Sequence, residues 1–394
     1  MRPVFRTAAV VLATALLASA CSDASKSGEP LQGRKPSGDP IVIATIGNRV
    51  IGGSDVTTSF DGVEAWVAGV NDRGGIFGRP VEWVSCDGKE DPQKTIACAQ
   101  KYASDPKVVA LVGGISSLMA TSVNPTASKA DLLQILNGNS YSDQRMKDVL
   151  ISGSGVLGQN VGLTKYVVGT GLKKVAVIRA DIGITEDAAK GVKGAVEAAG
   201  GTYLGDVAVP LTATDYSSAV LQAVGDGAEV LATTLTVPGL IGVISAIKSN
   251  GLEDKVTVTT SPISLSDPNV QKQLGNVKVL AFADSRIREA GQAGHDEYVA
   301  DLKLAGKVSV AGQARTASGW LAARLFEEVI KNAGKDFTRK SLIESAQNGV
   351  FKVPGFSGDV TVKGAPAQDA TVTLNKIFIT DGKGSIVAGP VAAY

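Results

Sequence analysis

The sequence predicts an α/β protein with two lobes, each built around a parallel β-sheet that helices cover on both faces. Short apolar segments alternate along the chain with segments whose apolar residues recur at helical spacing, a pattern typical of parallel sheets buried on both faces. The composition, 44% hydrophobic with 5% aromatic residues and 46 glycines, is typical of βα units joined by glycine turns. A length of 394 residues favours two lobes over one.

The first series of elements opens with an apolar strand at 41–45. Apolar residues from Phe60 to Val70 then recur at helical spacing, and Gly74-Gly75 ends that helix. The elements predicted next are a strand ending at Cys86, a helix with Asp91 as N-cap and Pro92 in its first turn, a strand at 108–112, a helix at about 117–130 and a strand at 132–136.

A second series repeats the alternation from residue 175. Its predicted strands are 175–178, 230–234, 256–260 and 279–282, and its predicted helices are 186–199, 216–224, 238–249, 293–305, 313–333 and one beginning at Thr338. Segments 360–362 and 371–379 read as antiparallel strands.

Irregular stretches with glycine or proline at 152–158, 283–291 and 348–358 are the predicted crossovers between the lobes. Three crossovers make both lobes discontinuous, with 41–152 plus 285–347 in one and 158–282 plus 356–394 in the other. A ligand cleft is expected between them.

The N-terminal residues 1–20 have the pattern of a signal peptide. Arg2 and Arg6 precede an apolar run at 8–17 that is too short to span a bilayer. Small residues then lead to Cys21, which resembles a bacterial lipobox and implies diacylation of Cys21; ordinary secretion with an incidental cysteine is the alternative. Residues 21–39 are polar and rich in serine, glycine and proline, so we expect a flexible tether outside the membrane.

Cys86 and Cys98 are the two cysteines besides Cys21. Export to an oxidising compartment favours a disulfide between them, and two buried free thiols are the alternative.

Charge and motifs exclude several classes of function. The net charge is +1 and the sequence has no run of lysine and arginine, so nothing indicates a nucleic-acid partner. The sequence contains one histidine, His295, and none of the patterns GxSxG, Walker loop, HExxH or CxxC. We therefore expect a monomeric binding protein without catalytic activity, cofactor or metal.

The turn after the strand at 108–112 predicts a binding site. Gly113-Gly114 leads through Ile115 to Ser116 and Ser117, which begin the next helix. A helix start offers free N–H groups at the positive end of the helix dipole, so this turn is suited to a carboxylate or phosphate.

Four motifs carry a resemblance to a known family. GGIFGRP, Asp91-Pro92, LVGGISS and ILNGNS occur in the order and spacing of the leucine/isoleucine/valine-binding proteins, and the likeness covers about 41–394. The resemblance implies a type I periplasmic binding protein fold, in which two Rossmann-like lobes close on a small molecule and present it to the permease and ATPase subunits of an ABC importer. It further implies that Ser116 and Ser117 bind a ligand carboxylate and that Asn139 and Ser140 face the ligand's polar end.

The opposite side of the cleft departs from that family. Members that bind α-amino acids commonly place a carboxylate after the strand matching 256–260, but here no acid occurs before Asp267. An ammonium buried without a carboxylate is costly, so a standard branched-chain amino acid is not a safe expectation. The expected ligand is a small carboxylate-bearing molecule, either an amino acid or a related organic acid or amide. Asp181 or Asp284 could substitute for the missing acid.

The remaining predicted ligand contacts come from the second lobe. They are the hydroxyls of Thr233, Thr234 and Thr260 and the apolar walls Ile184 and Leu235. Arg49 and Arg286 are candidates for a second anionic group or for solvated surface charges. A lipoprotein that senses a ligand and signals to a membrane partner remains the alternative to transport.

Overall fold

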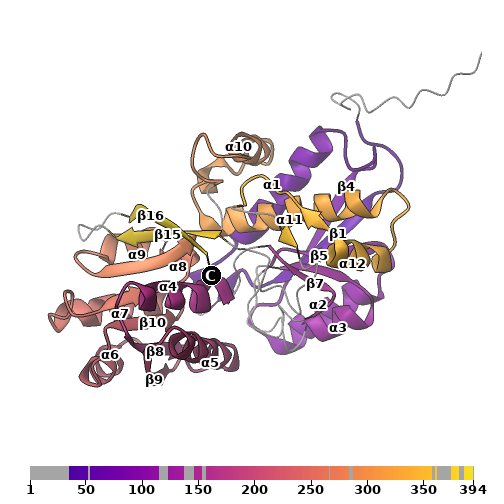
Figure 1. Cartoon of the computed structure of the whole chain (residues 1–394). Coiled ribbons are helices and arrows are strands. Elements are labelled where there is room, and N and C mark those ends of the chain that lie inside the picture. The colour runs from indigo at the N-terminus through magenta and orange to yellow at the C-terminus, as the bar shows by residue number, and fades with distance from the viewer. Residues whose placement is uncertain are drawn as a thin grey trace, which may run out of the picture.

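The computed structural model describes residues 35–51, 54–114, 123–136, 146–152, 157–265, 267–283, 287–356, 360–361, 374–380 and 386–393. Cys21, the predicted signal peptide and most of the predicted tether lie outside these residues. Within them the chain forms two α/β lobes side by side (Figure 1). We call the lobe with the five-stranded sheet lobe 1 and the lobe with the seven-stranded sheet lobe 2.

The sheet of lobe 1 is entirely parallel and has the order β4-β1-β5-β6-β7. Its strands are β1 (Ile41–Gly47), β4 (Val81–Asp87), β5 (Val108–Val112), β6 (Leu133–Leu136) and β7 (Val149–Ile151). All residues of β1 are buried, as expected for a central strand covered on both faces. The chain turns to one side of β1 for β4 and to the other for β5, which places a topological switch point between β1 and β5, where open α/β sheets bind ligands.

Six helices belong to lobe 1 among the described residues. They are α1 (Thr58–Asp72), α2 (Pro92–Ser104), α3 (Asn124–Lys129), α10 (His295–Leu304), α11 (Ala314–Ala333) and α12 (Arg339–Asn348). The short elements are the hairpin β2 (Val50–Ile51) and β3 (Ser54–Asp55) and the single turn η4 (Val308–Val310). The predicted cap of α2 is confirmed, because the Asp91 side chain accepts from the N–H groups of Gln93 and Lys94.

Lobe 2 repeats the strand order of lobe 1 and extends it. Its sheet has the order β16-β15-β12-β11-β10-β8-β9, in which β8 to β12 are parallel and the last two strands are antiparallel additions. The strands are β8 (Lys174–Ala180), β9 (Thr202–Val209), β10 (Val230–Thr234), β11 (Thr257–Thr259), β12 (Lys278–Ala283), β15 (Leu374–Thr380) and β16 (Ile386–Ala393). The helices are η3 (Leu157–Gly162), α4 (Leu163–Gly169), α5 (Gly183–Ala198), α6 (Ser217–Gly225), α7 (Val237–Ser249), α8 (Pro262–Leu265) and α9 (Pro268–Gln273).

The chain crosses between the lobes three times: after β7, after β12 and before β15. The predicted strand at 360–362 forms as β14 (Val360–Thr361), paired antiparallel with β13 (Val350–Phe351). This hairpin packs against α11 and α12 of lobe 1, whereas the sequence assigns everything from 356 onward to lobe 2.

Two helices of lobe 1 approach each other through glycines. A Cβ atom on Gly62 of α1 would lie 2.0 Å from the backbone oxygen of Thr316, and one on Gly319 of α11 would lie 2.0 Å from that of Ser59. Real side chains do not tolerate such distances, so the close packing of α1 on α11 depends on glycine at both positions.

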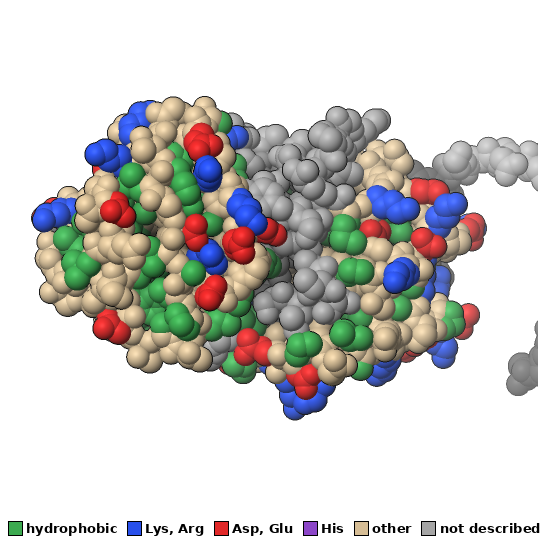
Figure 2. Space-filling model, turned by 90° about the horizontal axis from the view of Figure 1, so that it is seen from below, with side chains coloured by type: hydrophobic (Ala, Val, Ile, Leu, Met, Phe, Trp, Pro, Cys, Tyr) green, Lys and Arg blue, Asp and Glu red, His purple; other side chains and the backbone are tan. Residues whose placement is uncertain are grey.

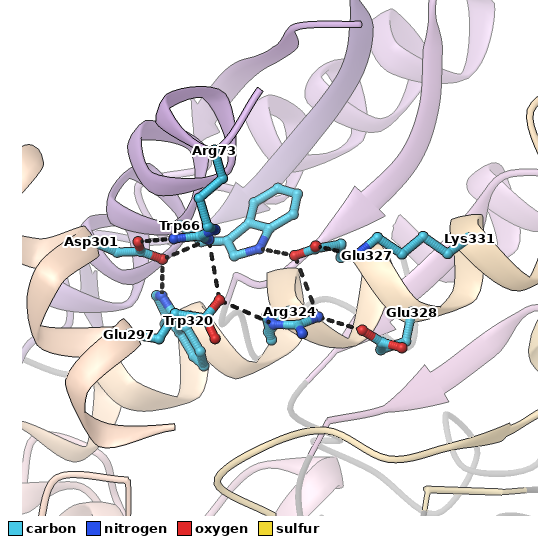
Figure 3. Close-up of polar contacts among 9 residues, drawn as sticks. All are labelled: Trp66, Arg73, Glu297, Asp301, Trp320, Arg324, Glu327, Glu328 and Lys331. Atoms are coloured by element: carbon cyan, nitrogen blue, oxygen red, sulfur yellow. Dashed lines mark hydrogen bonds and ion pairs between the residues drawn. The ribbon is translucent and has the colours of Figure 1, made fainter. Parts of the chain in front are cut away.

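Buried carboxylates bind α1, α10 and α11 together (Figure 3). Asp301 of α10 has no exposed surface and receives both terminal nitrogens of Arg73, at 2.5 and 3.2 Å, from α1. Its Oδ2 atom also accepts from the indole nitrogen of Trp320 on α11, at 2.9 Å. One carboxylate therefore satisfies donors from the two neighbouring helices.

Glu327 of α11 makes the reciprocal contact with α1. It accepts from the indole nitrogen of Trp66 at 3.0 Å and from Lys331 at 2.6 Å. Burial acts to raise the pKa of Glu327, but the charges of Arg324 and Lys331 outweigh it and hold that pKa below its ordinary value. Glu327 is therefore ionised at neutral pH, and its bond to Trp66 ties α11 to α1 (Figure 3).

Arg339 fastens α12 to the sheet of lobe 1. Its guanidinium donates to the backbone oxygens of Tyr102, Ala103, Asp105, Val108 and Ala130. These carbonyls flank the loop between α2 and β5 and begin the loop after α3. One side chain from the C-terminal part of the chain therefore closes two loops of the N-terminal part.

The sulfur atoms of Cys86 in β4 and Cys98 in α2 lie at bonding distance, and their Cα atoms are 5.9 Å apart. This geometry is compatible with the predicted disulfide. On the face shown in Figure 2, lysine and arginine side chains are interspersed with aspartate and glutamate over the described surface. No helix among the described residues is long and apolar enough to cross a membrane.

Candidate functional site

The Gly113-Gly114 turn leaves β5 at the carboxyl edge of the lobe 1 sheet. Both residues have positive φ angles, +69° and +89°, and a Cβ atom on Gly114 would lie 2.1 Å from the backbone oxygen of Ile46 in β1. The turn therefore requires glycine and lies directly at the switch point between β1 and β5. The predicted contacts Ser116, Ser117, Asn139 and Ser140 follow β5 and β6 but lie outside the described residues.

A small pocket lies beside this turn, formed by residues from the start of α1, the ends of β5 and β7, and α11. Its lining residues are Ser59, Gly113, Gly114, Ser152, Ser318, Gly319 and Ala322. All of them are uncharged. The pocket has room for about one water-sized group and supplies no charge of its own.

The hydroxyls of the pocket differ in what they can offer. Ser59 donates to the backbone oxygen of Val56 at 2.9 Å, and Ser152 donates to that of Leu136 at 3.0 Å. Their oxygen atoms remain as acceptors. The hydroxyl of Ser318 has no hydrogen-bond partner among the described residues and is free to donate.

Lobe 2 brings four of the predicted residues to one edge of its sheet. Ile184 lies in the first turn of α5 after β8, Thr234 ends β10 and Leu235 follows it, and Thr260 follows β11. Because β8, β10 and β11 are adjacent parallel strands, their carboxyl ends meet at the same edge. The Thr234 hydroxyl is buried with no partner in the described part of the chain.

The other predicted contacts of lobe 2 are more constrained. The Thr233 hydroxyl donates to the backbone oxygen of Thr259 at 2.9 Å within the sheet. Leu235 is partly buried against the core of lobe 2.

The two arginine candidates stand apart from these contacts. The Arg49 guanidinium stacks over the ring of Phe60, 4.5 Å from its centroid, and Arg286 lies outside the described residues.

Neither candidate for the missing acid offers an inward carboxylate in the described structure. Asp181, at the end of β8, is ion-paired with Arg179 at 3.8 Å, and 68% of its side-chain surface is exposed. Asp284 lies outside the described residues.

Four residues near this region escaped the sequence prediction: Ser59, Ser152, Ser318 and Arg315. Ser318 and Arg315 are both on α11, which follows all the parallel strands in the chain. No local pattern connects an amphipathic helix with strand ends so far away, so only the tertiary structure reveals that α11 lines the site.

The parallel strands of both lobes have the same doubly wound order, and uncharged polar residues lie at the strand ends of both. These features place the chain in the class of two-lobed α/β proteins. A family model described as "Periplasmic binding protein" matches residues 51–377. The chain belongs to this family, and the predicted resemblance is confirmed.

Several solved structures share the fold. A solute-binding protein of an ABC transporter from R. palustris in complex with 4-hydroxybenzoate is 21% identical, with a TM-score of 0.72 over 90% of this chain and 97% of that one. A leucine-binding protein from Thermotoga maritima is 16% identical, with a TM-score of 0.72 over 90% and 99%. A fatty acid ABC transporter substrate-binding protein from Thermomonospora curvata is 16% identical, with a TM-score of 0.73 over 92% and 94%. No curated protein sequence matches this chain.

Proposed function

We propose that this periplasmic binding protein is an extracytoplasmic lipoprotein that captures a small carboxylate-bearing molecule between its lobes and delivers it to the permease and ATPase subunits of an ABC importer. The observation that carries the proposal is the family match over residues 51–377. In the same proposal Cys21 carries the lipid, Cys86 and Cys98 are bonded, and the protein acts as a monomer.

The geometry of lobe 1 supports a carboxylate. The Gly113-Gly114 turn lies at the switch point of the sheet, and the serines that follow it in the sequence suit an anionic oxygen. The solved structures with this fold include proteins whose names state 4-hydroxybenzoate, benzoate, leucine or fatty acid, all of which carry a carboxyl group.

The geometry of lobe 2 favours an acid without an ammonium group. The strand ends present the Thr234 hydroxyl and the neighbours Ile184, Leu235 and Thr260. Asp181 is exposed and paired with Arg179. Among the described residues at these strand ends a zwitterion's ammonium would meet no counter-charge, whereas a hydroxylated or apolar acid has no ammonium to balance.

A thermal-shift screen tests the ligand class. The screen contains benzoate, 4-hydroxybenzoate, isovalerate, 4-methyl-2-oxopentanoate, decanoate and leucine. We expect at least one acid lacking an ammonium to raise the melting temperature more than leucine does. At one hundred times the dissociation constant a ligand adds about 2.7 kcal/mol to the stability of the folded state. If no member of the screen raises the melting temperature, the proposed ligand class is wrong.

Replacement of Ser117 tests the proposed carboxylate contact. We expect Ser117→Ala to weaken binding of the acid from the screen by about 1–3 kcal/mol, because a hydrogen bond to a charged group is lost. The matched control is Ser104→Ala, which removes an exposed hydroxyl at the far end of α2 and should leave binding unchanged. Isothermal titration calorimetry gives both values, and equal affinities for Ser117→Ala and the wild type would remove Ser117 from the site.

A further inference from the structure

Arg315, in the first turn of α11, is a half-buried cation without a partner among the described residues. It makes no hydrogen bond and no ion pair with any described residue. The other interior arginines of lobe 1 have partners: Arg73 is bonded to Asp301, and Arg339 to five carbonyls. Arg324 is ion-paired with Glu297, Glu327 and Glu328. A partly desolvated guanidinium with five unused donors calls for an anion.

The two carboxylates whose charges act on Arg315 already serve the backbone. Asp55 of β3 accepts from the N–H of Thr57 at 2.8 Å, and Asp267 caps α9 by accepting from the N–H of Asn269 at 2.8 Å. Their charges act on Arg315 from a distance, yet burial dominates and lowers the pKa of Arg315. The guanidinium therefore keeps its planar donor fork for another anion.

Arg315 lies on α11 between the small pocket of lobe 1 and the strand ends of lobe 2. It precedes Ser318 of the pocket by one helical turn on the same face of α11. The other side of this boundary belongs to lobe 2, because α11 contacts α8, which begins two residues after Thr260. A hydrogen bond from Thr58 to the Gln313 side chain at 3.2 Å holds this end of α11 against the start of α1.

We propose that Arg315 binds the carboxylate of the ligand at the boundary between the lobes and makes the site selective for an acid over its neutral amide. This inference rests on the proposed function. A guanidinium matches a carboxylate with two parallel N–H···O bonds. The positive end of the α11 dipole adds to the same potential. The pocket lining is neutral, so Arg315 supplies the balancing charge.

The test compares acids with their isosteric amides. Binding of 4-hydroxybenzoate and 4-hydroxybenzamide, and of isovalerate and isovaleramide, is measured by calorimetry on the wild type, Arg315→Gln, Arg315→Lys and Lys303→Gln. Lys303 is exposed on α10, so Lys303→Gln makes the same change in net charge away from the site. Thermal unfolding without any probe shows that each variant is folded.

We expect Arg315→Gln to weaken acid binding roughly 10- to 100-fold and to leave amide binding unchanged, since a charge-assisted bond is lost. The acid affinity of Arg315→Lys should lie between those of Arg315→Gln and the wild type, because lysine keeps the positive charge but lacks the planar pair of N–H donors. Lys303→Gln should bind both acids and both amides with the affinity of the wild type.

Two results for Arg315→Gln would overturn this inference and leave the proposed function standing. One is an equal weakening of acid and amide binding, which would assign Arg315 to a contact between the lobes. The other is unchanged binding of both. Failure of the wild type to bind any of the four probes would instead count against the proposed ligand class, and the inference would fall with it.

Discussion

Replacement of Gly319 by alanine is expected to lower the free energy of unfolding by about 2–4 kcal/mol. The new methyl group would lie 2.0 Å from the backbone oxygen of Ser59, so α11 must move away from α1. Because Gly319 and Ser59 also line the pocket, the same shift should weaken ligand binding. Urea denaturation and calorimetry on one protein preparation measure both effects.

A glycine on the other lobe supplies the control. Gly194 lies exposed within α5, and a Cβ atom there would meet nothing within 4 Å. Gly194→Ala should therefore stabilise the protein by about 0.5–1 kcal/mol, because alanine favours the helix. A Gly319→Ala variant as stable as the wild type would show that the α1–α11 contact is looser than described.

Loss of the Asp301 carboxylate should be at least as damaging. Asp301→Ala leaves the buried indole nitrogen of Trp320 without an acceptor and removes the bidentate partner of Arg73. Breaking a buried pair from one side typically costs about 3–5 kcal/mol. We expect a loss of this size in urea denaturation at neutral pH.

Two further variants separate the contributions at Asp301. Asp301→Asn keeps an acceptor for Trp320 but removes the charge that Arg73 requires, so an intermediate loss is expected. Asp296→Ala removes an exposed carboxylate from the same helix and should cost about 0.5 kcal/mol through the helix dipole. Similar losses for Asp296→Ala and Asp301→Ala would contradict the role given to the buried network.

The central strands could be predicted because burial on both faces leaves a continuous apolar run. Strands β1, β5, β8 and β10 follow this rule, and their predicted bounds differ from the observed ones by at most two residues. Two of the missed strands violate it. Strand β9 lies at the sheet edge with a mixed burial pattern, and β7 is only three residues long.

The residues of the candidate site also differ in whether the local sequence reveals them. The Gly113-Gly114 turn has a local signature, because two glycines directly after an apolar strand imply a special backbone geometry. Ser59, Ser318 and Arg315 have none, since helical serines and arginines are common on any solvent face. Their place beside the strand ends depends on how α11 crosses lobe 1.

The discontinuity of lobe 1 has a consequence for the order of folding. Its core combines strand residues such as Ile41 and Leu150 with Trp320, Phe326 and Leu342, which the chain supplies only after the parallel strands of lobe 2. Arg339 then closes loops that were synthesised more than 200 residues earlier. An emerging chain therefore has no complete core in lobe 1 until nearly its whole length is available, and these contacts of large sequence separation make its folding a late and slow event.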